Sequence, residues 1–278
     1  MSPTITIKSF ALHFLLIVGG LLSLFPFYWM SVIATNKSSD VFRFPPKLVF
    51  GSNFLLNVQH VFANINFGTS FLNTIGVSTC AMVLVLFFSS MAGFFFAKYR
   101  FPGSIVLFNI LLISLMIPSQ LSLIPSFIII SNFGWISTFK ALILPGLVPA
   151  TAFGVFWIRQ YAKDTIHDEL LDAGRIDGCH DFRLYWHVGF PLLRPALAFL
   201  GLFSFISTWN DYLWPLVVMN NPKKYTLQIS LSQLNSIYST DYSLVMAGTL
   251  LATIPLIVIF LVFSKQFIAN IAAGAVKA

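Results

Sequence analysis

The chain has 278 residues, of which 57% are hydrophobic and only 9% are charged. A soluble domain carries roughly 25% charged residues, so this composition excludes an ordinary soluble domain, a disordered chain and a collagen-like chain, and it requires lipid as the main solvent. The net charge of +7 does not point to nucleic acid, because the 16 basic residues are scattered. Cys80 and Cys179 lie far apart and form no CxxC pattern, so we expect neither a disulfide framework nor a metal site.

Six stretches of the chain are apolar over the roughly 20 residues that a membrane-spanning helix requires. The first stretch is too long for the hydrophobic region of a signal peptide, which covers about 7–15 residues, and it contains Pro26 and Trp29. We therefore interpret it as a retained span. Prolines inside the third, fourth and sixth stretches predict kinks, which membrane helices tolerate. The six predicted spans cover about residues 9–33, 71–97, 105–130, 141–158, 196–218 and 244–263.

Lysine and arginine favour one orientation of these spans. With a cytoplasmic N-terminus, ten basic residues fall on the inside and six on the outside, and such a bias sets the topology of short loops. The inside set is Lys8, Lys98, Arg100, Arg159, Lys163, Arg175, Arg183, Arg194, Lys265 and Lys277, and the outside set is Lys37, Arg43, Lys47, Lys140, Lys223 and Lys224. The sequence thus predicts an all-α membrane protein, a single transmembrane domain over 1–278, with six helices and both termini in the cytoplasm.

The segment between the fourth and fifth predicted spans is far more polar than the rest of the chain. It holds six of the nine acidic residues, which are Asp164, Asp168, Glu169, Asp172, Asp177 and Asp181. We expect two short helices, the first capped by Asp164 and the second by Asp181. Gly178 suits the end of the first helix because glycine adopts the left-handed conformation, and Asp172 can pair with Arg175 at i,i+3. The apolar side of the first helix would comprise Leu170, Leu171, Ala173 and Ile176.

A solvated loop would explain the acidity of this segment, but it would not explain a helix, a break and a second helix. A short rigid element of this kind suits a groove on a cytoplasmic partner. The segment, about 164–191, resembles the EAA loop of the permease subunits of bacterial ABC importers. The pattern of that family is Glu-Ala-Ala, three residues, Gly, nine residues, then Ile-x-Leu-Pro. In chain order the matched positions are Asp172, Ala173 and Gly174, the spacer Arg175, Ile176 and Asp177, then Gly178, and after nine residues Val188, Gly189, Phe190 and Pro191.

The match has four departures from the family pattern and no gap. Asp replaces Glu, Gly replaces the second Ala, Val replaces Ile and Phe replaces Leu, so that charge, small size and apolar character are retained. Gly174 in place of Ala loosens the first helix by roughly 1 kcal/mol. We expect these departures to leave docking intact.

The resemblance extends over nearly the whole chain, to the carbohydrate-uptake permeases of the maltose and glycerol-3-phosphate type. The segments that carry it are ELLDAGRIDG, FPLLRPAL, AKYRFPG at 97–103, WNDYLWPL at 209–216 and GAVKA at 274–278. It implies the type I ABC importer transmembrane fold in a bacterial inner membrane, and a sugar or sugar derivative as substrate, although it does not name the sugar. It implies four partners for this chain, namely a second homologous permease, two ATPase subunits and an external solute-binding protein.

The resemblance also implies how work is divided in such a complex. The EAA loop docks into a cleft on an ATPase subunit and transmits its closure to the membrane helices. No GxxxxGKS or GxxxxGKT pattern occurs in this chain, so we expect ATP to be used in trans and this subunit to carry no catalytic residue and no cofactor. Gly274 and Lys277 in the tail would extend between the two ATPase subunits, whereas an ordinary terminus would fray and tolerate deletion.

A polar-aromatic cluster lies late in the fifth predicted span, at Trp209, Asn210, Asp211, Tyr212 and Trp214. Sugars favour aromatic faces with hydrogen-bonding groups, so the first four residues are candidates for the translocation path. Tryptophan and tyrosine also populate membrane interfaces because they are amphipathic, and we favour that interfacial or structural role. The external segments, about 34–70 and 220–243, are long enough to contact a binding protein, and the first could equally be an ordinary surface loop.

A self-sufficient secondary transporter is the alternative from another class. Proton- and ion-coupled carriers usually keep ionisable residues inside the helix bundle, but the second, third, fourth and sixth predicted spans have none. A membrane-embedded enzyme is a weaker alternative, because the five histidines form no HExxH or comparable cluster. Co-purification of an ATPase would separate the importer from the carrier.

Overall fold

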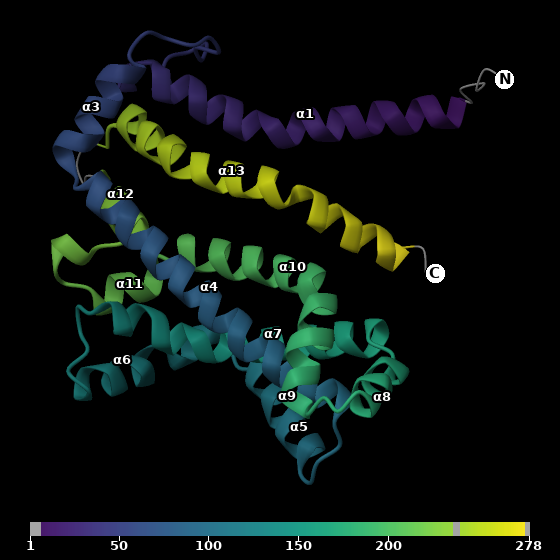
Figure 1. Cartoon of the computed structure of the whole chain (residues 1–278). Coiled ribbons are helices and arrows are strands. Elements are labelled where there is room, and N and C mark those ends of the chain that lie inside the picture. The colour runs from purple at the N-terminus through teal and green to yellow at the C-terminus, as the bar shows by residue number, and fades with distance from the viewer. Residues whose placement is uncertain (1–6, 236–239, 276–278) are drawn as a thin grey trace. The chain divides into compact units, whose positions relative to one another are not determined.

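The computed structural model describes residues 7–235 and 240–275, and these residues are helical, with turns and loops between the helices and no strand among them. The chain forms two compact units, Met1–Phe67 with Ser230–Ile254, and Gly68–Ile229 with Pro255–Ala278. Each unit is described in turn, and Figure 1 labels the helices. Within the described residues, five helices are long and apolar enough to cross a membrane, or six if one sharply bent pair counts as a single span.

The first unit is built on the long helix α1 (Ile7–Thr35), followed by α2 (Ser38–Val41) and α3 (Phe54–Asn64). The side chains of α1 are mostly exposed along its apolar length, as expected for a helix solvated by lipid, until Val32 begins a buried turn. The unit also contains the end of α12 (Leu227–Ser232) and the first part of α13 (Tyr242–Ala275). A methyl group on Gly248 of α13 would overlap Leu231, so α13 approaches this part of the chain closely.

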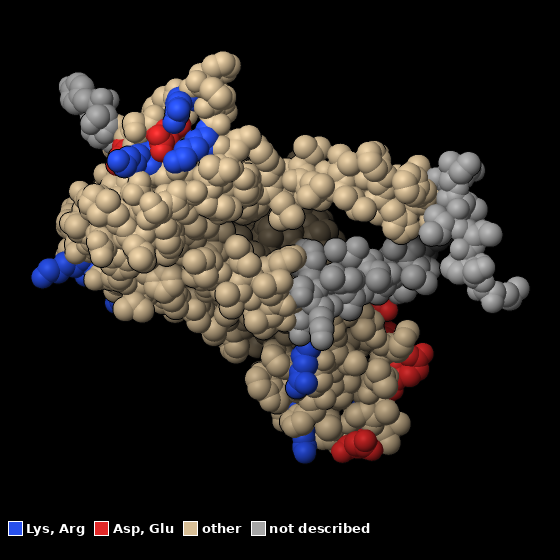
Figure 2. All heavy atoms as spheres, turned by 90° about the horizontal axis from the view of Figure 1, so that it is seen from above, with Lys and Arg blue, Asp and Glu red and all other residues tan. Residues whose placement is uncertain are grey.

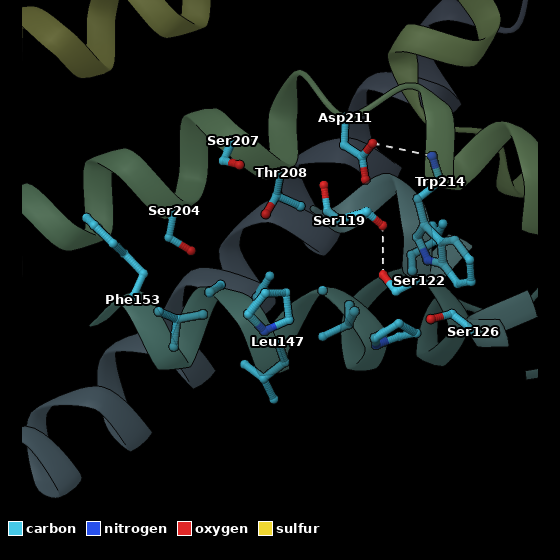
Figure 3. Close-up of a pocket in the computed structure, with 18 of the residues that line it drawn as sticks. Ser119, Ser122, Ser126, Leu147, Phe153, Ser204, Ser207, Thr208, Asp211 and Trp214 are labelled. Atoms are coloured by element: carbon cyan, nitrogen blue, oxygen red, sulfur yellow. Dashed lines mark hydrogen bonds between the residues drawn. The ribbon is translucent and has the colours of Figure 1, made fainter. Parts of the chain in front are cut away.

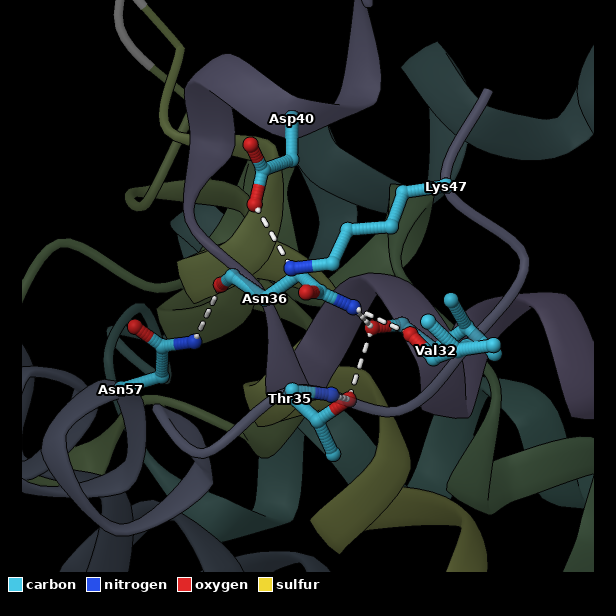
Figure 4. A network of polar contacts seen from close by, with 8 residues as sticks. Val32, Thr35, Asn36, Asp40, Lys47 and Asn57 are labelled. Atoms are coloured by element: carbon cyan, nitrogen blue, oxygen red, sulfur yellow. Dashed lines mark hydrogen bonds and ion pairs between the residues drawn. The ribbon is translucent and has the colours of Figure 1, made fainter. Parts of the chain in front are cut away.

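Polar side chains close the C-terminal end of α1 (Figure 4). The Asn57 side-chain amide donates hydrogen bonds to the carbonyl oxygens of Ala34, at 2.8 Å, and Asn36, at 3.0 Å. The Asn36 amide donates to the carbonyl of Val32, at 2.8 Å. Because the last carbonyls of a helix have no partner within it, these side chains supply the missing donors and fix α3 against the end of α1.

The second unit packs α4 (Phe67–Lys98), α7 (Phe139–Thr165) and α10 (Phe190–Trp209) through small residues. A methyl group on Gly93 would lie 2.7 Å from the Ile158 side chain, and one on Gly154 would overlap Ser89. Small residues let membrane helices approach closely, which increases their van der Waals contact. The resulting core comprises Val85, Phe94, Ile158, Ala162, Ile166, Leu171, Leu184, Tyr185, Leu193, Ala196, Leu197 and Leu200.

The third predicted span, 105–130, is not one straight helix. It consists of α5 (Ser104–Leu115), a 3₁₀ turn η1 (Ser119–Ser122) and α6 (Leu123–Asn132), and the two halves meet at 93°. Pro118 lies at the break, because proline has no N–H to donate and disfavours a helical conformation in the residue before it. Pro125 lies in the first turn of α6, where a proline is tolerated.

The fifth predicted span, 196–218, is also interrupted. The helical run starts earlier, with α9 (Asp181–Leu184) and a π turn η2 (Tyr185–Gly189), and continues through α10 to Trp209. After a break it resumes as the separate α11 (Leu213–Val218). Pro215 accounts for the break, because its ring would clash with the Asp211 carbonyl in a continuous helix, whereas α11 accommodates it in its first turn. A 3₁₀ turn η3 (Pro222–Lys224) then leads to α12.

Candidate functional site

The polar segment after α7 begins with α8 (Asp168–Ile176), later than the sequence indicated. Asp164 does not cap it, because α7 continues through Asp164 to Thr165. The chain breaks at Ile166 instead, which is extended and buried in the core of the second unit. Asp168 opens α8, and its carboxylate lies 2.9 Å from Lys98 Nζ at the end of α4. The hydrogen bond from Lys98 lowers the pKa of the Asp168 carboxyl below its usual value.

An ion pair on α8 confirms the predicted i,i+3 contact. Arg175 Nη1 lies 2.8 Å from Asp172 Oδ1. The Arg175 guanidinium also lies 5.7 Å from the centre of the Tyr99 ring, within the range of a cation–π contact. The outer face of α8 is therefore ordered by contacts with itself and with the residue that follows α4.

Gly178 ends α8 in the left-handed conformation, with φ at +80°, which confirms the prediction for this residue. Its N–H donates to the Arg175 carbonyl at 3.0 Å, and the Cys179 N–H donates to the Gly174 carbonyl at 2.9 Å. These two bonds form a Schellman motif, which satisfies carbonyls that the helix itself leaves free. The turn therefore has one well-defined geometry, which most side chains cannot adopt without strain.

A close contact at Gly174 brings α8 against the helix that follows the turn. A methyl group on Gly174 would overlap Cδ2 of Leu184, a fully buried residue of α9. The close approach at this glycine is thus made by the chain's own Leu184. Glycine has a lower helix propensity than alanine, but at position 174 it allows this close packing against Leu184.

The N-cap of α9 is His180 rather than Asp181. His180 Nδ1 accepts a hydrogen bond from the Arg183 N–H at 3.3 Å, and Asp181 is the first residue of the helix. The sequence-based prediction placed the N-cap one residue too late, because it considered only serine, threonine, aspartate and asparagine, the residue types most common at N-caps. Asp181 still lies in the first turn, where an acidic side chain is favourable.

The π turn anchors this segment to α4. The hydroxyl groups of Tyr185 and Ser90 are hydrogen-bonded at 2.7 Å in the core, and a methyl group on Gly189 would lie 2.6 Å from the Phe94 ring. Pro191 follows at the second position of α10. A displacement of α8 and α9 must therefore move α10 or disrupt this core.

The outer surface of α8, α9 and the π turn carries apolar side chains among charges. The predicted apolar side of α8 is buried only at Leu171, whereas Ile176 is 87% exposed. Acidic side chains gather at this end of the second unit (Figure 2). We call this exposed set the coupling surface; its large apolar members are Leu170, Ile176, Phe182 and Trp186.

A cavity of about 500 Å³ lies in the second unit (Figure 3). Its walls come from α4, η1, α6, α7, α10 and the break before α11. Phe153, Phe203 and Trp214 supply aromatic surface. The polar lining consists of Ser119, Gln120, Ser122, Ser126, Ser204, Ser207, Thr208 and Asp211.

The helix breaks place these groups around the cavity. The 93° bend after α5 brings Ser119 and Ser122 to one wall, where the Ser122 hydroxyl donates to the Ser119 carbonyl at 2.7 Å. Pro145 in α7 has no N–H for the Ala141 carbonyl, and Trp214 Nε1 donates to that carbonyl instead, at 2.7 Å. The carbonyl that Pro145 leaves without a partner in α7 thus holds the tryptophan of α11.

The four residues predicted for a translocation path have different environments. Asp211 lines the cavity, and its carboxylate accepts a hydrogen bond from the Trp214 N–H at 3.4 Å. Trp209 is only 1% exposed and packs edge-on against Phe71. The Asn210 side chain donates to the carbonyl at the preceding turn of α10, and Tyr212 is partly exposed outside the cavity lining.

Sequence reasoning missed the hydroxyl groups that make up most of the polar lining of the cavity. They recur at helical spacing, at 119, 122 and 126 and again at 204, 207 and 208. In an apolar helix, hydroxyl groups spaced three or four residues apart share one face. This spacing could have predicted a polar helix face from the sequence. It was overlooked because the stretches are strongly apolar on average. The arrangement of hydroxyls, one carboxylate and aromatic rings in a concave site suits an uncharged ligand that carries many hydroxyl groups.

Known proteins similar to this chain are bacterial transport components. Residues 88–271 match the family model described as "Binding-protein-dependent transport system inner membrane component". The chain is 34% identical to the "Arabinooligosaccharides transport system permease protein AraQ" of Bacillus subtilis (strain 168), over 99% of this chain and 98% of that protein. It is 33% identical to the "Lactose transport system permease protein LacG" of Rhizobium radiobacter, over 94% of this chain and 93% of that protein.

A solved structure shares the fold. It is described as a bacterial ABC transporter involved in the import of the acidic polysaccharide alginate, and it matches with a TM-score of 0.78 at 24% identity, over 96% of this chain and 99% of that chain. At this identity the structural match shows the fold alone. The family model and the two sequence relatives show to which family the chain belongs. The chain therefore belongs to the family of inner-membrane components of binding-protein-dependent transport systems, as a multi-pass permease of the bacterial inner membrane.

Proposed function

We propose that this chain is one permease subunit of an ATP-driven importer of a sugar or sugar derivative, and that its cavity forms part of the translocation path. The observation that carries the substrate class is the cavity lining of hydroxyls, Asp211 and aromatic rings. Relatives named for arabinooligosaccharide and lactose transport support the same class. Family membership decides against the self-sufficient secondary transporter.

The coupling surface is the proposed contact with an ATPase subunit. Ile176 and Phe182 are exposed large apolar side chains on a helix pair that is otherwise fixed by Gly178 and by the Tyr185–Ser90 hydrogen bond. Exposed apolar groups within a charged rim mark protein-binding surfaces. Closure of the ATPase pair would push α8 and α9, and the continuous helical run into α10 would carry that movement to the cavity wall.

The remaining assignments follow from membership of a binding-protein-dependent system. A second homologous permease would complete the path, two ATPase subunits would use ATP, and a solute-binding protein would deliver the sugar on the outside. Both termini would be cytoplasmic, as the lysine and arginine bias predicts. Gly274 is the penultimate residue of α13, and Lys277 lies outside the described residues; the contact of this tail with the ATPase pair remains a proposal from the sequence.

Reconstitution tests the proposed function directly. The permease is co-purified with its partner subunits, placed in liposomes with ATP on the ATPase side, and supplied with the binding protein and radiolabelled oligosaccharides. We expect uptake that requires both ATP and the binding protein. Uptake by the purified chain alone, driven by a proton or sodium gradient, would contradict the proposal.

A further inference from the structure

The loop after α1 folds back along the helix that it leaves. The Tyr28 hydroxyl donates to the Leu48 carbonyl, the Asn36 amide donates to the Val49 carbonyl at 2.9 Å, and the Gly51 N–H donates to the Thr35 hydroxyl at 3.0 Å. Tyr28 precedes Asn36 by eight residues, or about 12 Å along a helix axis. The hydroxyl of Tyr28, about two turns before the end of α1, thus reaches the loop at Leu48, next to the residue that bonds to Asn36.

This loop carries large apolar side chains that the protein leaves exposed. Phe44 is 95% exposed and Phe42 is 73% exposed. The other large apolar side chains that are exposed in the loop are Leu48, Val49 and Phe50. Such a concentration on a short loop is costly in water, because each of these side chains gains about 1.5–3 kcal/mol on full burial.

The charged residues of the loop are mostly basic. Lys37, Arg43 and Lys47 carry positive charge, and Asp40 is the acidic residue between 36 and 51. Lys47 Nζ lies 3.3 Å from the Asp40 carboxylate, which holds the two arms of the loop together (Figure 4). Basic side chains gather on this part of the surface in Figure 2. Together, cations and exposed aromatic rings are the combination that binds at the surface of an anionic membrane.

The helix α1 determines how deep the loop lies. Its apolar stretch, Ser9–Thr35, has 27 residues, which corresponds to about 40 Å of helix, whereas the hydrocarbon core of a bilayer is about 30 Å thick. About 10 Å of this stretch therefore extends beyond the hydrocarbon core. We assign that part to the last turns of α1, because tyrosine, here Tyr28, is favoured in the headgroup region. The Phe50 ring packs edge-on against Tyr28, with ring centres 5.6 Å apart, so it shares that depth.

We propose that residues 37–51, the fold-back loop, bind the lipid surface at the C-terminal end of α1. Phe42, Phe44 and Phe50 would insert at the boundary between headgroups and acyl chains, while Arg43 and Lys47 contact anionic phospholipid headgroups. The loop would thereby anchor the first unit at one depth in the bilayer. This proposal needs only the membrane location of the chain, and it is independent of the transported solute.

Gly51 provides a way to remove the fold-back without changing the apolar side chains. A methyl group at this position would overlap the Thr35 carbonyl oxygen and the Asn36 side chain. The carbonyl belongs to the backbone of α1 and cannot move aside. Gly51→Ala should therefore displace the returning arm of the loop. Gly68→Ala is the matched control, because nothing lies within 4 Å of the added methyl group.

Spin-label accessibility in nanodiscs tests the proposal on the complete transporter. Cys80 and Cys179, the two free cysteines, are replaced by serine, and Phe44→Cys or Ser39→Cys provides the labelling site. Collisions with oxygen report lipid, and collisions with a water-soluble nickel complex report solvent. In nanodiscs that contain phosphatidylglycerol, we expect an oxygen-to-nickel ratio at position 44 that is several-fold higher than at position 39 and is unchanged by the solute-binding protein.

Three results would overturn the proposal. A label at position 44 that is as accessible to nickel as the label at position 39 would place the loop in water. A label shielded from both reagents, whether from the outset or only after the solute-binding protein is added, would assign the loop to a protein contact instead. An oxygen-to-nickel ratio that falls equally in Gly51→Ala and Gly68→Ala, or in neither, would show that the fold-back does not set the depth.

Discussion

The segment α8–α9 and the wall of the cavity are both places where helices break, but they break in different ways. Between α8 and α9, a positive-φ glycine, a Schellman motif and a buried contact at Leu184 define a single geometry. Around the cavity, prolines remove helix bonds, and side chains such as Trp214 supply substitutes. The first kind of break suits an element that transmits force, and the second suits one that changes shape.

The most severe test of this comparison is Gly178→Pro. Proline fixes φ near −65° where Gly178 has +80°, and a misplaced proline costs about 3 kcal/mol or more, so we expect ATP-driven uptake to fall by at least about tenfold. Uptake and membrane abundance should be measured together. Gly134→Pro is a matched control, because Gly134 also has a positive φ, at +67°, and lies in the loop between α6 and α7. Equal losses in both variants at normal abundance would remove the special role of the α8–α9 turn.

Removing a hydrogen-bond donor from the cavity wall should weaken that wall. Trp214→Phe leaves the Ala141 carbonyl without its Nε1–H donor, and an unsatisfied buried acceptor costs about 1–3 kcal/mol. We expect a lower midpoint of thermal unfolding for the purified complex in detergent. Trp186→Phe, at a half-exposed position of the π turn, should leave the midpoint nearly unchanged. An unchanged midpoint in Trp214→Phe would show that the Ala141 carbonyl needs no donor from outside α7.

A hydroxyl of the cavity should contribute to substrate affinity without affecting the coupling segment. Ser207→Ala removes one lining hydroxyl, and a single hydrogen bond is worth about 0.5–1.5 kcal/mol, so we expect the KM for transport to rise about two- to twelvefold. The maximal rate should stay close to that of the parent protein. Ser114→Ala on α5 removes a hydroxyl that bonds only within its own helix, to Leu111, and should leave the KM unchanged. A fall in the maximal rate with no change in KM for Ser207→Ala would argue against substrate contact.

The smallest expected effect is the pH dependence of the Lys98–Asp168 ion pair. Because Lys98 lowers the pKa of Asp168 in the folded protein, the pair is fully stabilising at neutral pH, and its contribution is lost as the pH falls through that lowered pKa, below about 4. The Asp168 side chain is 79% exposed, so solvent limits the contribution to less than about 1 kcal/mol. Unfolding of Asp168→Asn, compared with Glu169→Gln, between pH 3 and pH 7 measures it. We expect a smaller loss of stability toward pH 3 in Asp168→Asn than in the parent protein and no such difference in Glu169→Gln; an Asp168→Asn variant as acid-sensitive as the parent would contradict the assignment.

Local sequence signals predicted the turn between α8 and α9 better than its helix boundaries. Gly178 and the Asp172–Arg175 pair depend on neighbours within a few residues, and both are present as expected. The start of α8 was misplaced because burial of Ile166 decides where α7 ends, and that burial depends on residues far away in the sequence. A pattern of neighbouring residues in the sequence carries no information about such tertiary contacts.

Hydropathy located the spans and could not show how they break. Pro118 and Pro215 are visible in the sequence, but a proline predicts a kink without stating its size, and the bend at Pro118 reaches 93°. The candidate path was placed on Trp209, Asn210, Asp211 and Tyr212. Of these, Asp211 lines the cavity together with the serines of α10, whereas Trp209 is buried. Which face of an apolar helix meets a cavity depends on its packed neighbours, which one sequence does not specify.

The π turn at Tyr185–Gly189 has a geometric consequence for the helix that follows. Each residue of an α-helix rotates the chain by about 100°, and a π turn holds one residue more than an α turn. The hydroxyl of Tyr185 fixes the start of the π turn to α4. The direction in which Ser204 and Ser207 of α10 point around the helix axis therefore depends on how far the chain rotates between Tyr185 and α10. If residues 185–189 instead formed an α turn at unchanged chain length, the extra residue would advance the chain by about 100° and rotate the hydroxyl face of α10 away from the cavity, whereas deletion of that residue would leave the phase nearly unchanged. The π turn thus sets the phase between the proposed ATPase contact on α8 and α9 and the face of α10 that lines the cavity.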